Sequence, residues 1–399
     1  MSLKLNNIFI FFIIGTLLFN SLDFIQIMLF NVPDVSFLSH YSSYLKFLRM
    51  LIYGVLFIFA IYYLFKKNQL GKNIVYAIFI FACFCLYLSE NLLFYLQGMV
   101  LLMPFIFIIL FLNSLEEFNF NKILKIIIFL FIINITAQII QYLFYNDLVH
   151  FVWSIFYEGK TENIISIIIR NPGIFNMPNL SALLGLISLF IVYYYISINN
   201  YLKIFLLILG IISIILTKSG TAMATLIICM FILLLDKFYK YKNKIIICFI
   251  PLIVMIYFVL EKITYRVGLF KESFGQRIEW FKIAYDNTEW FSTAFGQAGN
   301  LIWKAYLSNY LNQKLLYADS FLTVILINFG KFIFFLNIIM IIILFIWLYK
   351  NNNFRFMVLI TIFLLFSFTM SVVEAYPVNL ILSFLIAFEI KNIMEKRYV

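Results

Sequence analysis

The sequence predicts an all-helical, polytopic integral membrane protein, and three properties of its composition indicate this class. Of its 399 residues, 65% are hydrophobic, against roughly 45–50% in an ordinary globular protein. Charged residues make up only 12% of the chain, and the mean hydropathy is +1.03. A soluble globular protein, a disordered chain and a fibrous protein are therefore excluded.

Apolar runs along the chain define the expected spans, because crossing a hydrocarbon core of about 30 Å takes about 20 helical residues. We expect about twelve spans, near residues 8–30, 44–65, 74–89, 92–112, 123–145, 178–198, 202–217, 221–235, 245–260, 332–349, 356–373 and 378–390. Residues 1–399 are thus predicted to form a single membrane domain. Two loops are long enough to build structure outside the membrane: 146–177, and the larger 261–331 between the ninth and tenth spans.

The distribution of lysine and arginine predicts the orientation. Most of the short connections that carry these residues fall on one side of the twelve-span arrangement, whereas short connections on the other side, such as 89–91 and 374–377, are acidic. Under the positive-inside rule both termini face the cytoplasm and both large loops face outward. The same rule accounts for the net charge of +11, so a nucleic-acid partner is not expected.

Known metal, nucleotide and redox motifs are missing from the sequence. It has no Gly-rich phosphate loop with a lysine, no His-Glu-x-x-His and no Asp-x-Asp, and its two histidines, His40 and His150, stand alone. The four cysteines lie inside apolar runs, where cysteine behaves as a small hydrophobe. We therefore expect neither a metal nor a cofactor. His150 remains open as an incidental residue or a base.

The larger outer loop is unusually basic, with seven cations between residues 261 and 318, several of them beside aromatic residues. Long loops cross the membrane regardless of charge, so this does not contradict the orientation. The pattern predicts one or two interfacial helices, in which a cation is either an anchor at the headgroups or part of a site. The same two readings hold for Lys46 and Arg49 near the outer end of the second span.

Three local motifs lie at outward positions. The first runs from Arg170 to Asn179 as RNPGIFNMPN, with Pro178 suited to a first helical turn and with Asn176 and Asn179 offering cap oxygens. A helix N-terminus beside an arginine attracts anions. The second is the turn LTKSGTA at 216–222, whose cation is Lys218.

The third motif has three parts, which are GQRIEW at 275–280, FGQAG at 295–299 and YADSF at 317–321, with Gly330 further on. They would bring a basic helix, a glycine turn and an acidic residue together just before the chain re-enters the membrane.

In this order and on this topology, the three motifs resemble the bacterial O-antigen polymerase and O-antigen ligase superfamily, of GT-C-like architecture. Two departures from the family pattern stand out. The outer turn often continues with an arginine where this chain has Gly220, so Lys218 must supply the cation there or none does. Ligases carry His-Asn where this chain has Asp319-Ser320, which favours the Wzy-type polymerase.

The resemblance implies a metal-independent glycosyltransferase that moves a growing glycan from undecaprenyl diphosphate onto a lipid-linked repeat unit outside the cytoplasm. Its partners would be undecaprenyl-diphosphate-linked oligosaccharide, membrane lipids and a chain-length regulator. Arginines that stabilise the leaving diphosphate would be the main catalytic groups. The implied set is Arg170 and Arg277 as clamps, Lys218 and Arg266 as supports, Asp319 as base with Glu279 as the weaker candidate, and Asn176, Asn179 and Trp280 as further substrate ligands. Asp319 could equally be the N-cap of a helix that starts at Ser320.

Two alternatives remain open. An O-antigen ligase would transfer the glycan to the lipid A core instead. A lipid-linked oligosaccharide flippase would be a transporter, and it should carry cations inside its spans. Because nearly every predicted span is free of charge and the cations gather in one outer loop, chemistry at the surface is favoured over transport.

Overall fold

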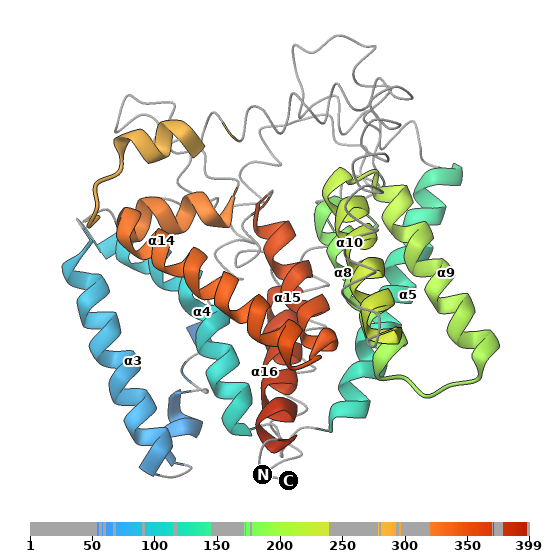
Figure 1. Cartoon of the computed structure of the whole chain (residues 1–399), viewed down its shortest axis with the longest axis horizontal. Helices are drawn as coiled ribbons and strands as arrows, with labels where there is room; N and C mark the ends of the chain where they lie inside the picture. Colours follow the sequence, from blue (N-terminus) through green and yellow to red (C-terminus); the bar gives the residue numbers. More distant parts are fainter. Residues whose placement is uncertain are drawn as a thin grey trace. The chain divides into compact units, whose positions relative to one another are not determined.

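The computed structural model describes residues 54–55, 58, 61–66, 69–89, 92–114, 119–144, 171, 173–175, 178–238, 278, 281–292, 295–296, 320–368, 370 and 378–396. Within these ranges every regular element is a helix. The main helices are α3 (Gln69–Tyr87), α4 (Leu92–Ser114), α5 (Phe120–Phe144), α8 (Pro178–Tyr194), α9 (Asn200–Thr217), α10 (Gly220–Lys237), α14 (Phe321–Lys350), α15 (Phe354–Ser367) and α16 (Val378–Lys396) (Figure 1).

These helices coincide with nine of the predicted spans. The spans predicted at 8–30 and 245–260 lie outside the described residues, and 44–65 is described only in part. Among the described residues, five helices are long and apolar enough to cross a membrane: α3, α5, α9, α10 and α14. Shorter apolar helices lie at Leu102–Asn113, Pro178–Tyr194 and Phe354–Ser367. The protein is therefore a helical protein of the kind embedded in membranes, as its composition predicts.

Several helix ends differ by a few residues from the predicted spans, and the start of α14 differs most. We expected the large loop to continue to residue 331 and the span to begin at 332, but α14 begins at Phe321. Its N-cap is Ser320, whose hydroxyl donates to the carbonyl oxygen of Ser367 at 3.1 Å. The N-cap reading of Asp319 is therefore wrong by one residue. The helix contains a break at Gly330, where φ is 84° and ψ is 172°.

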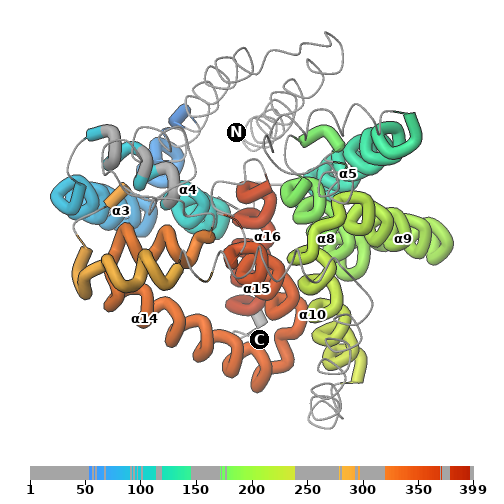
Figure 2. The backbone as a smooth tube through the Cα atoms, turned by 90° about the horizontal axis from the view of Figure 1, so that it is seen from above, coloured from blue at the N-terminus to red at the C-terminus, as the bar shows by residue number. Residues whose placement is uncertain are grey.

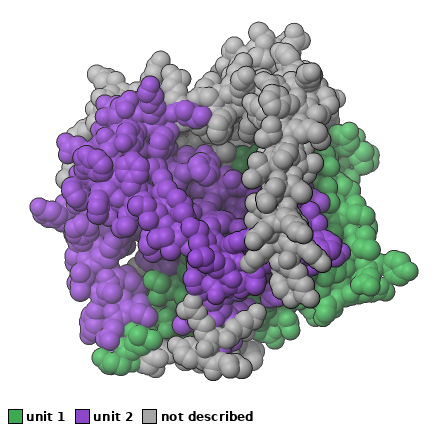
Figure 3. Space-filling model, in the orientation of Figure 1, with its two compact units in different colours: residues 1–71, 107–223, 375–391 green, residues 72–106, 224–374, 392–399 purple. Residues whose placement is uncertain are grey.

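The chain forms two compact units, each built from several separate stretches (Figure 3). Unit 1 comprises Met1–Gly71, Phe107–Met223 and Ala375–Lys391. Its described core contains α5, α8 and α9, which lie side by side in both backbone views (Figures 1 and 2). An aromatic cluster joins the start of α5 to α16 and to the end of α8. In it the Phe120 ring stacks on Phe388 at 3.6 Å, and Tyr195 meets Phe120 edge to face at 5.3 Å.

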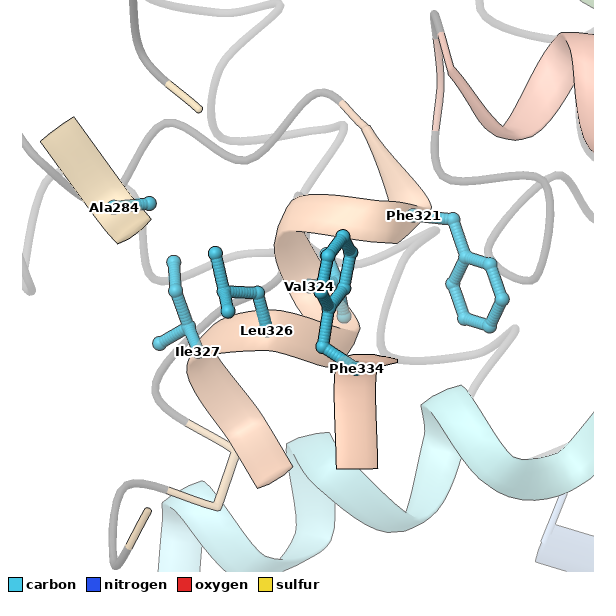
Figure 4. Close-up of a cluster of buried hydrophobic side chains, with 6 residues drawn as sticks. All are labelled: Ala284, Phe321, Val324, Leu326, Ile327 and Phe334. Carbon is cyan, nitrogen blue, oxygen red and sulfur yellow. The ribbon is translucent and has the colours of Figure 1, made fainter. Parts of the chain in front are cut away.

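Unit 2 comprises Lys72–Ile106, Ala224–Glu374 and Asn392–Val399. A helix at 281–287 lies within the segment predicted to carry interfacial helices, and it packs on α14. Figure 4 shows the core of this contact, formed by Ala284, Phe321, Val324, Leu326, Ile327 and Phe334. The cluster holds side chains from both sides of the break at Gly330, so apolar burial fixes the two halves of α14 against the same helix.

Candidate functional site

Three amide side chains line one face of α5 in unit 1. Asn134, Gln138 and Gln141 follow one another at intervals of four and three residues, which places them on the same side of a helix. Their exposed fractions are 0%, 0% and 2%. A buried amide in an apolar helix is costly unless it is hydrogen-bonded. Each of the three amides forms hydrogen bonds within unit 1.

Gln141 pairs with the backbone of Gly173 in the first motif. Its Nε2 donates to the Gly173 carbonyl oxygen at 2.7 Å, and its Oε1 accepts from the Gly173 N–H at 2.8 Å. Gly173 has φ of 67°, in the left-handed region, which residues with a side chain seldom adopt. A Cβ atom at this position would also collide with Asn134 Oδ1. Glycine is required here for both reasons.

The other two amides bind the residues on either side of Gly173. Gln138 Nε2 donates to the Asn171 carbonyl oxygen at 3.1 Å, while its Oε1 accepts from the Ser213 hydroxyl of α9 at 2.7 Å. Asn134 Oδ1 accepts from the Ile174 N–H and from the Ser181 hydroxyl of α8, each at 3.1 Å. Residues 171, 173 and 174 are thus bound by their backbone to α5, and Ser181 of α8 and Ser213 of α9 bind the same amides.

The turn between α9 and α10 is bound to the same segment. The Asn171 N–H donates to the Leu216 carbonyl oxygen at 3.2 Å, so the first and second motifs are in direct contact. Lys218 ends α9 with φ of 49° and ψ of 30°, a conformation that is uncommon for a residue with a long side chain. It is half-buried, between the buried Thr217 and Ser219. A lysine kept in this conformation is a candidate functional residue.

Two buried side-chain atoms in this cluster have no hydrogen-bond partner among the described residues. They are Asn134 Nδ2, a donor, and Asn171 Oδ1, an acceptor. Buried unsatisfied polar atoms are rare in proteins. We call the polar cluster of Asn134, Gln138, Gln141, Ser181 and Ser213, together with residues 171, 173 and 174, the amide cradle.

The third motif lies in unit 2, at the break in α14. In a continuous helix the Lys331 N–H would bond to the Ile327 carbonyl oxygen. Here that carbonyl accepts instead from the Ser292 hydroxyl at 2.6 Å, and the Lys331 N–H donates to the Glu289 carbonyl oxygen at 3.1 Å. Every backbone group must find a partner inside a membrane protein. Residues 289–292 supply those partners at the break.

One hydrogen bond and one aromatic contact hold the glycine turn of this motif. The Gly296 N–H donates to Asn328 Oδ1 at 2.9 Å, and the Phe295 ring lies 5.5 Å from the ring of Phe329. Asn328 is 1% exposed, so this bond is shielded from solvent. Phe295 and Gly296, the described residues of the FGQAG part, thus contact the two residues of α14 that precede Gly330 by one and two positions.

Only two of the nine predicted site residues lie within the described ranges. Lys218 is at the end of α9, and Asn179 is half-buried in the first turn of α8, directly after Pro178. The start of α8 at Pro178 confirms the predicted helix start. Outside the described residues lie Arg170, Asn176, Arg266, Arg277, Glu279, Trp280 and Asp319, and also His40, Lys46, Arg49 and His150. Their roles stay predictions.

The three α5 amides were not identified from the sequence, although a signal was present. The three amides recur every three or four residues, and so lie on one face of a mostly apolar helix. Polar residues inside membrane spans commonly mark functional positions. Among the described residues there is no group of three His, Cys, Asp or Glu side chains that could hold a metal ion. Metal independence stays a prediction.

No protein-family model, curated protein or solved structure matches this chain.

Proposed function

We propose that this protein is a surface-polysaccharide polymerase of the O-antigen type, which joins lipid-linked repeat units at the outer face of a bacterial inner membrane. The observation that carries the proposal is the contact between the first and second motifs in the amide cradle. The resemblance assigns one diphosphate clamp, Arg170, to the first of these motifs and a supporting cation, Lys218, to the second. Their contact through the Asn171 N–H and the Leu216 carbonyl oxygen supports a common role.

The proposed topology has about twelve spans, both termini in the cytoplasm and the largest loop, 261–331, between the ninth and tenth spans on the outer side. In this arrangement the amide cradle lies near the outer ends of α5 and α9. A chain-length regulator is the proposed protein partner.

The proposed reaction is a transfer at an anomeric carbon. The acceptor hydroxyl of a lipid-linked repeat unit attacks the anomeric carbon of the growing glycan, and the bond from that carbon to the diphosphate oxygen breaks. Undecaprenyl diphosphate leaves with the electron pair, and the hydroxyl proton passes to a carboxylate, for which Asp319 is the first candidate and Glu279 the second. Because diphosphate is already a good leaving group, no nucleotide is needed.

The protein must then stabilise the negative charge that develops on the departing diphosphate. Arginine suits this role, because its planar guanidinium binds phosphate oxygens in pairs. Arg170 directly precedes Asn171, a residue of the amide cradle, in the sequence. Lys218 belongs to the turn that Asn171 contacts. Arg266 and Arg277 keep the roles that the resemblance implies.

A strain that lacks this chain tests the function directly. Loss of a polymerase should leave lipid A core that carries one repeat unit, and restoring the gene should restore the ladder of long chains. Loss of a ligase or a flippase should leave core with no repeat unit at all. An unchanged ladder in the deletion strain would refute all three assignments.

A substitution at Arg277 tests the clamp separately. If its guanidinium binds two oxygens of the diphosphate at once, Arg277→Lys should lose nearly as much polymerase activity as Arg277→Ala, at normal protein abundance. The reason is that lysine keeps the charge but cannot bind two oxygens in the same way. An interfacial anchor should tolerate lysine. The exposed Lys282 provides the control, since both Lys282→Arg and Lys282→Ala should leave the chain-length distribution unchanged.

A further inference from the structure

The pairing between Gln141 and Gly173 differs from an ordinary side-chain contact. One amide satisfies both the N–H and the carbonyl oxygen of the same residue, at 2.8 Å and 2.7 Å. An amide side chain used in this way replaces the neighbouring peptide group that a helix or sheet would provide. Gln141 is 2% exposed, so water does not offer these bonds in its place.

Hydrogen bonds to other elements hold residues 171, 173 and 174 of the segment in place. Residues 171 and 173–175 are not helical, and irregular backbone at membrane depth is tolerated only where protein groups satisfy it. Among the described residues, the backbone groups of Asn171, Gly173 and Ile174 form hydrogen bonds with the three α5 amides and with the Leu216 carbonyl oxygen. The conformation of the segment therefore depends on α5.

We propose that Gln141 is a positioning residue, which holds Gly173 in its left-handed conformation and thereby orients the segment that begins with Arg170 toward the donor diphosphate. This inference rests on the proposed function and deepens it, because it assigns a role in the same site to a residue that touches no substrate. Gln138 and Asn134 support the same segment through Asn171 and Ile174.

Amide hydrogen exchange of the purified protein tests the positioning without reference to activity. In Gln141→Leu the peptide that covers residues 171–175 should exchange at least tenfold faster than in the wild type, because two hydrogen bonds are lost. The control is Thr136→Val on the same helix. Thr136 is exposed, and its hydroxyl donates to the Ile132 carbonyl oxygen at 2.8 Å, so this substitution should leave exchange at 171–175 unchanged.

Gln141→Glu gives a reversible version of the same test. A protonated carboxyl can accept from the Gly173 N–H and donate to its carbonyl oxygen, as the amide does, whereas an ionised carboxyl can only accept. Exchange protection in this variant should therefore be near the wild-type value at low pH and should fall as the pH rises. The described side chains packed on this face are Asn134, Gln138, Ser181 and Ser213, and none of these residue types titrates.

Activity is measured on lipid-linked single repeat units extracted from the deletion strain. Elongation by Gln141→Glu should fall with rising pH in parallel with exchange protection, while the wild type and Thr136→Val should not show this fall. If Gln141→Leu does not fold, the test rests on Gln141→Glu, which should be folded at low pH and can be compared with itself at higher pH.

Unchanged exchange in Gln141→Leu would overturn the positioning role. So would faster exchange combined with full elongation, because the segment would then be free to move without consequence. If the deletion strain shows normal polysaccharide, the proposed function fails, and the exchange measurement still decides whether Gln141 holds the segment.

Discussion

Replacing Gly330 by alanine is the most direct test of the broken helix in unit 2. Gly330 has φ of 84° and ψ of 172°, a conformation that is essentially restricted to glycine and costs other residues about 1–3 kcal/mol. A Cβ atom there would lie 2.5 Å from the Trp290 carbonyl oxygen and 2.7 Å from the Ser292 nitrogen. Both neighbours are backbone atoms, so relief requires the segment at 289–292 to move away.

Moving that segment would break the hydrogen bonds that it makes with α14. These are Lys331 N–H to the Glu289 carbonyl oxygen, Phe332 N–H to the Trp290 carbonyl oxygen, and the Ser292 hydroxyl to the Ile327 carbonyl oxygen. At about 1 kcal/mol each, the loss of one or two adds to the backbone strain. We therefore expect Gly330→Ala to lower the free energy of unfolding by about 2–5 kcal/mol.

The loss is measured as a fall in melting temperature in detergent and as faster amide exchange at residues 331 and 332. The control is Gly54→Ala, because Gly54 is helical and a Cβ atom there has nothing within 4 Å. Alanine should be neutral or stabilising at that site by up to about 1 kcal/mol. A Gly330→Ala protein that is as stable as the wild type would refute the broken-helix geometry.

Four other substitutions or conditions have defined outcomes. Gly173→Ala should lower stability by about 1–3 kcal/mol because of its φ of 67° and the collision with Asn134, seen as a lower melting temperature; an unshifted melt would contradict it. Lys218→Gly should raise the melting temperature, since glycine relieves the φ of 49°, yet shorten the polysaccharide; long chains would show that this cation is dispensable. An impermeant thiol reagent outside the inner membrane should label Asn287→Cys but not Tyr241→Cys, and the reverse pattern would invert the topology. EDTA should leave elongation by purified protein intact, and a loss that magnesium restores would reveal a metal ion.

The sequence by itself determined the class of the protein and the places of its helices. Apolar runs of sufficient length have no stable form in a bilayer other than a helix, so composition and run length were enough. The starts of α4 at Leu92, α8 at Pro178 and α16 at Val378 agree with the predicted spans. The residues next to each of these starts in the sequence are enough to predict it.

The start of α14 could not be found in this way. Residues 321–327 are mostly apolar, but Asn328, Gly330 and Lys331 interrupt the apolar run after them, and Gly330 looked like part of a loop. Only the packing of the segment at 289–292 shows that glycine breaks a helix at this position and that Ser292 takes over the freed Ile327 carbonyl oxygen. The partner lies 35 residues away along the chain, and no local pattern encodes it.

The amide cradle shows the same division between sequence and tertiary structure. The motif at 170–179 and the turn at 216–222 were recognised as separate stretches, because each carries its own signal of proline, glycine and cation. Their contact, and the part that α5 plays in it, follow from tertiary structure. The two hydrogen bonds between Gln141 and Gly173 join residues 32 apart in the chain, and they satisfy two backbone groups that would otherwise be buried without partners. The sequence thus determined which residues could form a site, and the packing of α5, α8 and α9 decided which of them meet.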